Sequence, residues 1–186
     1  MLRIIVSGIA IAALAGAALA AEVAGVKLDD KASVGGKELV LNGAGLRTRA
    51  VFKVYVGSLY LPAKANTAAS ALASGPRRVQ LNLLRNLSAD QLVDALVDGL
   101  KDNTSEAEFV ALKAQTDQLV TIMKSFGEVK EGNVVTLDYA DGGTRIGLNG
   151  QPKGEVAGDP FNQALTRIWI GDKPVQADLK KAMLGG

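Results

Sequence analysis

The sequence predicts an α+β fold: one domain with a mainly antiparallel sheet and helices packed on one face of it. Three observations predict this class. Strand-like segments come first, helical segments follow, and the order then repeats. Several strand segments alternate apolar and polar residues, as half-buried strands do. Asp141-Gly142-Gly143 and Asn149-Gly150 are strong signals for tight hairpins between antiparallel strands.

The first twenty residues precede the folded domain. A short basic start with Arg3 is followed by an apolar stretch, and Ala18-Leu19-Ala20 offers the small residues that a signal peptidase requires. We therefore predict a signal peptide over residues 1–20, cleaved after Ala20 with Ala21 as the near alternative, and one domain over 21–186. A membrane anchor is the competing interpretation, but the stretch barely reaches a bilayer's width. The predicted location is the periplasm of a bacterium.

The first half of the domain is expected to contain three strands and a short helix. Residues 38–41 and 51–61 are rich in strand-forming residues, and Pro62 ends the second of these strands. Glycines and polar residues over 43–49 predict a bulge or turn between them. Residues 66–73 suit a short capped helix, and residues 77–85 alternate as a strand with one buried face.

Two packed helices should follow. Ser88 and Gln91 form the two ends of a capping box, and an apolar stripe continues over 92–100 at helical spacing. Ser105 repeats the capping signature before a second helix that extends to about residue 126.

The last third of the sequence predicts strands over 134–139, 144–148 and 153–157. Asp159 is expected to cap the helix that follows, with Pro160 in its first turn. A final short helix covers 176–183. Phe161 and Trp169 have the spacing of core residues in the first of these helices.

Composition excludes several kinds of site. The chain has no cysteine and no histidine, so it has no disulfide, no thiolate or imidazole zinc site and no histidine-based catalytic triad. We predict no metal and no cofactor. The formal net charge is +2, and removal of Arg3 with the signal peptide leaves +1, which favours neither nucleic acid nor an acidic membrane as a partner. After cleavage, no stable membrane insertion is expected. The oligomeric state stays open.

The most informative segment is GAGLRTRAVFKVYVGSLYLP, residues 43–62. It places Arg47 and Arg49 directly before an apolar strand. Arg47 is either a solvated turn residue or the anion-binding residue of a site at the edge of the core. A guanidinium suits the second role, because it stays charged and binds a carboxylate through two parallel hydrogen bonds. Arg49 is expected to face solvent, as is Lys53.

This segment resembles the conserved hairpin of the chalcone isomerase fold. RNLSADQLVDALVDGLKDN resembles the first cleft helix, and NQALTRIWIGDKPVQADLKKAMLG resembles the closing helices of the bacterial chalcone isomerase-like branch. The resemblance covers nearly the whole domain. It implies an open-faced β-sandwich with a ligand cleft between the large sheet and the helical layer. It also implies one of two activities, cyclisation of chalcones or non-catalytic binding of fatty acids whose carboxylate meets an arginine at the position of Arg47.

The chain departs from the pattern of the enzymes. By the resemblance, Tyr55 stands where the enzymes have a threonine, and Leu92 and Gly99 stand where the first cleft helix carries a tyrosine and an asparagine. Ile168 stands where a hydroxyl residue is expected near the end. Most of the polar catalytic set is thus missing, and no catalytic residue is assigned.

The predicted function is binding of a fatty acid or similar amphipathic carboxylate. Arg47 would hold the head group, with Tyr55 as a second donor. Apolar residues of the first cleft helix, including Leu92 and Leu96, close the core by default, and in the fatty-acid interpretation they would line the cleft for the tail. Two alternatives stay open. One is an intramolecular lyase, an isomerase that uses Arg47 to stabilise an oxyanion and Tyr55 to relay a proton. The other is a structural or partner-binding protein of the cell envelope.

Overall fold

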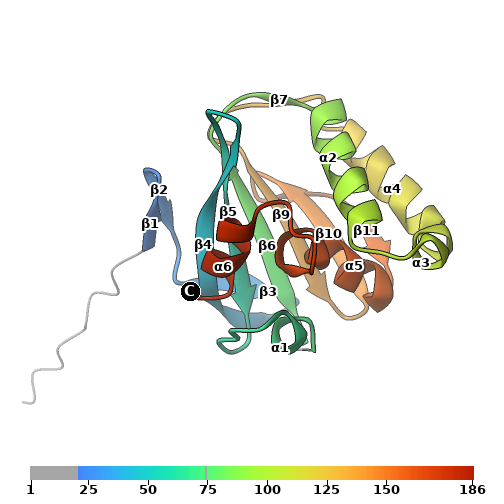
Figure 1. Cartoon of the computed structure of the whole chain (residues 1–186), viewed down its shortest axis with the longest axis horizontal. Coiled ribbons are helices and arrows are strands. Elements are labelled where there is room, and N and C mark those ends of the chain that lie inside the picture. Colours follow the sequence, from blue (N-terminus) through green and yellow to red (C-terminus); the bar gives the residue numbers. More distant parts are fainter. Residues whose placement is uncertain (1–20, 74) are drawn as a thin grey trace, which may run out of the picture.

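A seven-stranded antiparallel sheet with helices on one face forms the body of the protein (Figure 1). The computed structural model describes residues 21–73 and 75–186, so the predicted signal peptide lies outside the described residues. The strand order in the sheet is β11-β10-β9-β6-β5-β4-β3, and every neighbouring pair is antiparallel. The α+β class predicted from the sequence is confirmed.

The strands of the large sheet agree closely with the alternating segments of the sequence. Their bounds are β3 Lys31–Val34, β4 Lys37–Arg49, β5 Phe52–Leu61, β6 Arg77–Leu83, β9 Val134–Ala140, β10 Gly143–Leu148 and β11 Gln151–Ala157. Both predicted tight hairpins are present. Asp141-Gly142 and Asn149-Gly150 all have positive φ, between 52° and 81°, as a two-residue turn with the twist of the flanking strands requires.

The hairpin of β4 and β5 differs from the sequence prediction in one respect. The glycines and polar residues over 43–49 do not break the first strand. They continue it, and the turn falls at Ala50 and Val51 instead. The predicted irregularity appears as two shifts of register, between Leu41 and Gly43 and between Arg47 and Thr48. A bulge keeps the strand in the ladder while changing its twist, so a glycine-rich segment need not end it.

Short strands outside the large sheet were missed by sequence reasoning. β1 (Ala21–Val23) pairs with β2 (Val26–Leu28), and β7 (Leu87–Ser88) pairs with β8 (Glu128–Val129). Strands of two or three residues are too short to show an alternating pattern. β3 of the large sheet was also missed, because its four residues, KASV, contain only one large apolar side chain.

The helices lie together on one side of the sheet (Figure 1). Their bounds are α1 Ala68–Ala73, α2 Ala89–Asp102, α3 Glu106–Ala111, α4 Lys113–Lys124, α5 Asp159–Ile170 and α6 Ala177–Met183. The capping box of Ser88 and Gln91 is formed as predicted. The long helix predicted after Ser105 is two helices, because the chain leaves helical geometry at Leu112. Among the described residues, no helix is both long and apolar enough to cross a membrane.

Asp159 does not cap α5, contrary to the prediction. Gly158 occupies the capping position with φ 115°, and Asp159 is the first residue of the helix. From there its carboxylate lies 3.5 Å from the guanidinium of Arg77. The acidic residue therefore contributes charge at the helix start rather than a capping hydrogen bond.

Arg77 is the most deeply buried charge of the structure, with 2% of its surface exposed. Its Nε donates to Asn162 Oδ1 at 2.7 Å, and its Nη1 donates to the carbonyls of Ala71 and Leu72 at 3.1 and 2.6 Å. Asn162 in turn donates to Thr144 Oγ1 at 3.0 Å. This buried network joins α1, β6, β10 and α5.

The helix α6 lies directly on the β4–β5 hairpin because three glycines leave room for it. A Cβ built at Gly43 would collide with the backbone carbonyl of Ala182, and one at Gly45 would lie 2.7 Å from the Ala182 methyl group. Gly57, the pairing partner of Gly45, faces Leu179 of the same helix. This close approach brings the start of α6 beside Arg47, which follows the two β4 glycines on the same face.

Candidate functional site

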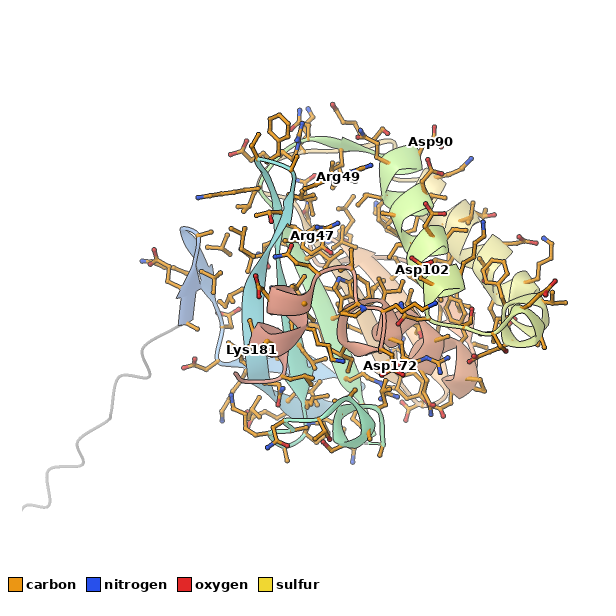
Figure 2. All side chains as sticks on the ribbon, in the orientation of Figure 1. Arg47, Arg49, Asp90, Asp102, Asp172 and Lys181 are labelled. Atoms are coloured by element: carbon orange, nitrogen blue, oxygen red, sulfur yellow. The ribbon has the colours of Figure 1, made fainter. Side chains whose placement is uncertain are left out.

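Arg47 lies on the helix-facing side of β4, close to the free end of the hairpin. It is half-buried and pairs in register with Tyr55 of β5. Figure 2 shows Arg47 and Arg49 on the hairpin, with Asp90 and Asp102 at the two ends of α2. The side chain of Arg47 thus faces the layer between the hairpin and the helices, as the anion-site interpretation requires. Arg49 and Lys53 are exposed to solvent, as predicted.

Gln176, the residue before α6, fixes the position of Arg47. Arg47 Nη1 donates to Gln176 Oε1 at 3.3 Å and to the backbone carbonyl of Thr48. Gln176 Oε1 also accepts from the Thr48 amide at 2.9 Å, and its Nε2 donates to the Leu46 carbonyl at 3.2 Å. A single glutamine therefore bridges three consecutive residues of β4 and orients the guanidinium.

The charge of Arg47 is not neutralised by a neighbouring acid. Among the described residues, no carboxylate lies within 4.0 Å of Arg47, and both of its hydrogen-bond acceptors are neutral oxygens. Arg77 and Arg78, by contrast, each have an aspartate partner. A half-buried cation without an anionic partner is a ready receptor for the head group of an anionic ligand.

Tyr55 is buried beside Arg47, with 8% of its surface exposed. Its hydroxyl accepts a hydrogen bond of 2.9 Å from Trp169 Nε1 of α5. Burial raises the pKa of the Tyr55 phenol, and the Trp169 hydrogen bond together with the positive charge of Arg47 offsets part of that rise. Because Trp169 supplies the donor, the Tyr55 proton is free to point toward another acceptor.

Leu92 and Leu96, the residues predicted to line the cleft, are on α2 and each is 5% exposed. They belong to the same hydrophobic core as Tyr55 and Trp169. In this structure the two leucines are therefore packed against protein side chains. Phe161 and Trp169 are core residues, as the sequence indicated.

Gly99 and Ile168, the positions where the resemblance leads us to expect polar residues in the enzymes, are in contact here. A Cβ at Gly99 of α2 would lie 2.7 Å from the Cγ2 of Ile168 on α5. The absence of a side chain at Gly99 lets the two helices pack closely, and Ile168 fills the space with methyl groups. A polar group at this point would be desolvated without a partner, at a cost of about 1–3 kcal/mol.

A separate hollow of about 520 Å³ lies on the other face of the sheet. Its lining includes Arg78, Gln80 and Asp138, which are polar side chains of β6 and β9. Arg78 is already held there by two hydrogen bonds of 2.6 Å to Asp138. The hollow contains none of the predicted site residues, and both of its arginines, Arg78 and Arg145, are paired with carboxylates.

Sequence reasoning missed Gln176 and the role of Trp169. No sequence pattern indicated these roles, because each residue lies more than a hundred positions after its partner in the chain, Arg47 for Gln176 and Tyr55 for Trp169. The helical spacing of Trp169 correctly predicted a core residue, but it did not predict the hydrogen bond to Tyr55.

All three tyrosines should titrate above the usual pKa of 10.0. Burial raises the pKa of Tyr55, of Tyr60 and of Tyr139. Since an unfolded tyrosine ionises first, the stability that these groups contribute is present below pH 10 and is lost as the pH rises toward their folded pKa values. Phenolate absorbance of the two buried tyrosines, Tyr55 and Tyr60, should therefore appear together with unfolding, and the Tyr55→Phe variant should unfold at a higher pH. Titration of any tyrosine at or below pH 10 in the folded protein would contradict this.

Comparison with known proteins agrees with this architecture. A family model described as chalcone isomerase-like matches residues 20–185. Among solved structures, a fatty-acid binding protein of Arabidopsis thaliana superposes with a TM-score of 0.67 at 14% sequence identity, over 86% of this chain and 92% of that chain. Comparison with curated protein sequences found no match.

Proposed function

Because the chain belongs to the chalcone isomerase-like family, we propose that it binds a fatty acid or a similar amphipathic carboxylate without catalysing a reaction. The site would lie between the sheet and the helices, and the protein would act in the periplasm after export. The similarity in fold to a protein described as fatty-acid binding supports the ligand class. The predicted signal peptide at residues 1–20 supports the location.

The observation that carries the proposal is the uncompensated charge of Arg47. Its guanidinium is half-buried on the helix-facing side of β4, its partners are neutral oxygens, and the Tyr55 hydroxyl lies beside it. A carboxylate placed here would accept charge-assisted hydrogen bonds from Arg47 and one from Tyr55. Gln176 holds the guanidinium in place, which lowers the entropic cost of binding.

The tail of the ligand would occupy the apolar layer beyond this head-group site. Each buried methylene contributes roughly 0.8 kcal/mol, so a long acyl chain supplies most of the affinity. Leu92 and Leu96 are packed in the core, and an acyl chain would have to move α2 outward from its neighbours to reach them. Helix α2 is the suitable element to move, because its main contacts are with the neighbouring helices α4 and α5.

The test compares Arg47→Ala with Arg49→Ala in direct binding of a long-chain fatty acid. Charge-assisted hydrogen bonds contribute about 1.5–3 kcal/mol, so Arg47→Ala should weaken binding about tenfold to a hundredfold or more. Arg49→Ala removes the same charge two residues away at an exposed position, and it should bind as the wild type does. Native mass spectrometry of the exported protein would also show a co-purifying fatty acid that Arg47→Ala has lost.

Equal affinity of Arg47→Ala and wild type would refute the head-group assignment. Turnover of a chalcone by the wild-type chain, followed by the loss of absorbance of the open form, would instead support the isomerase alternative. The contact of Gly99 with Ile168 argues against that alternative, because it leaves no polar group where the enzymes are expected to have two.

A further inference from the structure

The free end of the β4–β5 hairpin exposes large apolar side chains. Val51 is 88% exposed and Phe52 is 55% exposed, and Val110 of α3 is the one other exposed large hydrophobic residue among those described. Figure 1 shows the hairpin extending beyond the body of the sheet, so that its turn is at an extremity of the molecule. Two adjacent exposed apolar residues at such a point are available to a partner.

Turn chemistry does not account for these residues. Two-residue hairpin turns favour glycine, asparagine and aspartate, which are polar or small and tolerate positive φ. Here the turn is Ala50-Val51, and Ala50 adopts φ 52°. The other three tight hairpins of this sheet use Gly35-Gly36, Asp141-Gly142 and Asn149-Gly150, so the sheet uses ordinary turn residues elsewhere.

Basic residues surround the apolar tip. Residues 47–54 and 84–88 contain four basic residues and no acidic one, namely Arg47, Arg49, Lys53 and Arg85. The guanidinium of Arg85 lies over the ring of Phe52, 4.7 Å from its centroid. The neighbouring turn carries Glu128, Lys130 and Glu131, which offset part of this charge. The net charge of the whole chain does not favour binding to an anionic surface, but the positive charge around the hairpin tip does.

We propose that the tip of the β4–β5 hairpin, residues 49–53 together with Arg85, docks reversibly on a lipid bilayer that contains anionic lipids. Val51 and Phe52 would enter the interface, while Arg49, Lys53 and Arg85 would lie at the level of the lipid phosphates. An apolar patch with a basic border is the pattern that peripheral membrane elements share. The phosphates of anionic lipids complement the basic border, and the acyl layer beneath them takes up the apolar residues, so a bilayer surface fits both parts of the tip.

The tip also lies close to the proposed ligand site, and this step rests on the proposed function. Arg47 is three residues from Ala50 along β4, which is about 10 Å of extended strand. Interfacial elements enter the bilayer surface to a depth of about 5–10 Å. With the tip docked, Arg47 and Tyr55 would stand just outside the bilayer, where the carboxylate of a fatty acid in the membrane is accessible. Docking would then let the protein take up or deliver its ligand at the membrane.

The test measures binding of the exported protein to vesicles by flotation. Vesicles of phosphatidylcholine alone are compared with vesicles that also contain phosphatidylglycerol. Wild type should bind the second kind, and binding should weaken with added salt. The double variant V51S/F52S should bind about tenfold to a hundredfold more weakly, as expected from the apolar area removed. V110S is the control, because it changes an exposed apolar residue on α3, whose exposed fraction of 66% lies between those of Phe52 and Val51, and it should bind as wild type does.

Two further measurements locate the contact and separate this proposal from the proposed function. The F52W variant should show a blue shift of its added fluorescence on vesicle binding, above the constant signal of the buried Trp169. V51S/F52S should keep wild-type affinity for fatty acid in the absence of membranes. Failure of wild type to bind either kind of vesicle, or equal binding by V51S/F52S, would overturn membrane docking and leave the fatty-acid site untouched.

Discussion

Replacing Arg77 with methionine is expected to lower the free energy of unfolding by about 3–5 kcal/mol, a large part of the stability of a domain of this size. Methionine keeps much of the length and apolar volume of the arginine stem but none of its donors. Three acceptors would lose the guanidinium at once, namely Asn162 Oδ1 and the carbonyls of Ala71 and Leu72, and Asn162 Oδ1 would keep only a long hydrogen bond of 3.4 Å from Thr166 Oγ1. Each buried unsatisfied acceptor costs about 1–3 kcal/mol.

Arg78→Met is the control, since it removes the same side chain from the next position of the same strand. Arg78 points to the other face, where it and Asp138 are each 19% exposed and pair with one another. Water can reach the carboxylate that remains, so a smaller loss of about 1–2 kcal/mol is expected. Chemical denaturation of both variants measures the difference. Equal losses would show that burial of Arg77 is not what makes its network important.

The sequence predicted most of the large sheet because each long strand carries its own signal. β6 alternates strictly, β9 alternates over residues 134–138, and the turns on either side of β10 contain residues that favour positive φ. The capping box of Ser88 and Gln91 likewise marks the start of α2 from residues three positions apart. These features depend on neighbours in the chain, so they can be read without knowing the fold.

The candidate site was predictable only in part, because its geometry depends on contacts between distant segments. Arg47 and Tyr55 were identified from the hairpin motif, and the structure pairs them in register. Gln176 and Trp169, which hold them, come from the other end of the chain and show no local pattern that indicates this role. For Leu92 and Leu96 the sequence left two possibilities, core packing as the default and a cleft lining as the alternative, since an apolar stripe on a helix is the same in both cases, and in the structure both residues pack in the core.

The site is assembled only when α6 packs against the β4–β5 hairpin. Two substitutions that each add one methyl group to β4 should disrupt this packing to different degrees. Gly43→Ala places a methyl group against the backbone carbonyl of Ala182, which cannot move without displacing the helix. A loss of about 3 kcal/mol or more is expected, at or above the upper end for overpacking. Gly45→Ala meets the Ala182 methyl group at 2.7 Å, and a loss of about 1–3 kcal/mol is expected.

The nature of each clash predicts which variant can be rescued. Ala182→Gly removes the methyl group that opposes Gly45→Ala, so the double variant should recover most of the loss, apart from about 1 kcal/mol for glycine within a helix. The same change leaves the carbonyl of residue 182 in place, so it should not rescue Gly43→Ala. Thermal unfolding of Gly43→Ala, of Gly45→Ala and of each combined with Ala182→Gly measures both effects. Rescue of both or of neither would contradict the packing described. Since α6 begins beside Gln176, the unrescued variants should also lose fatty-acid affinity, because the guanidinium of Arg47 is then no longer held in place.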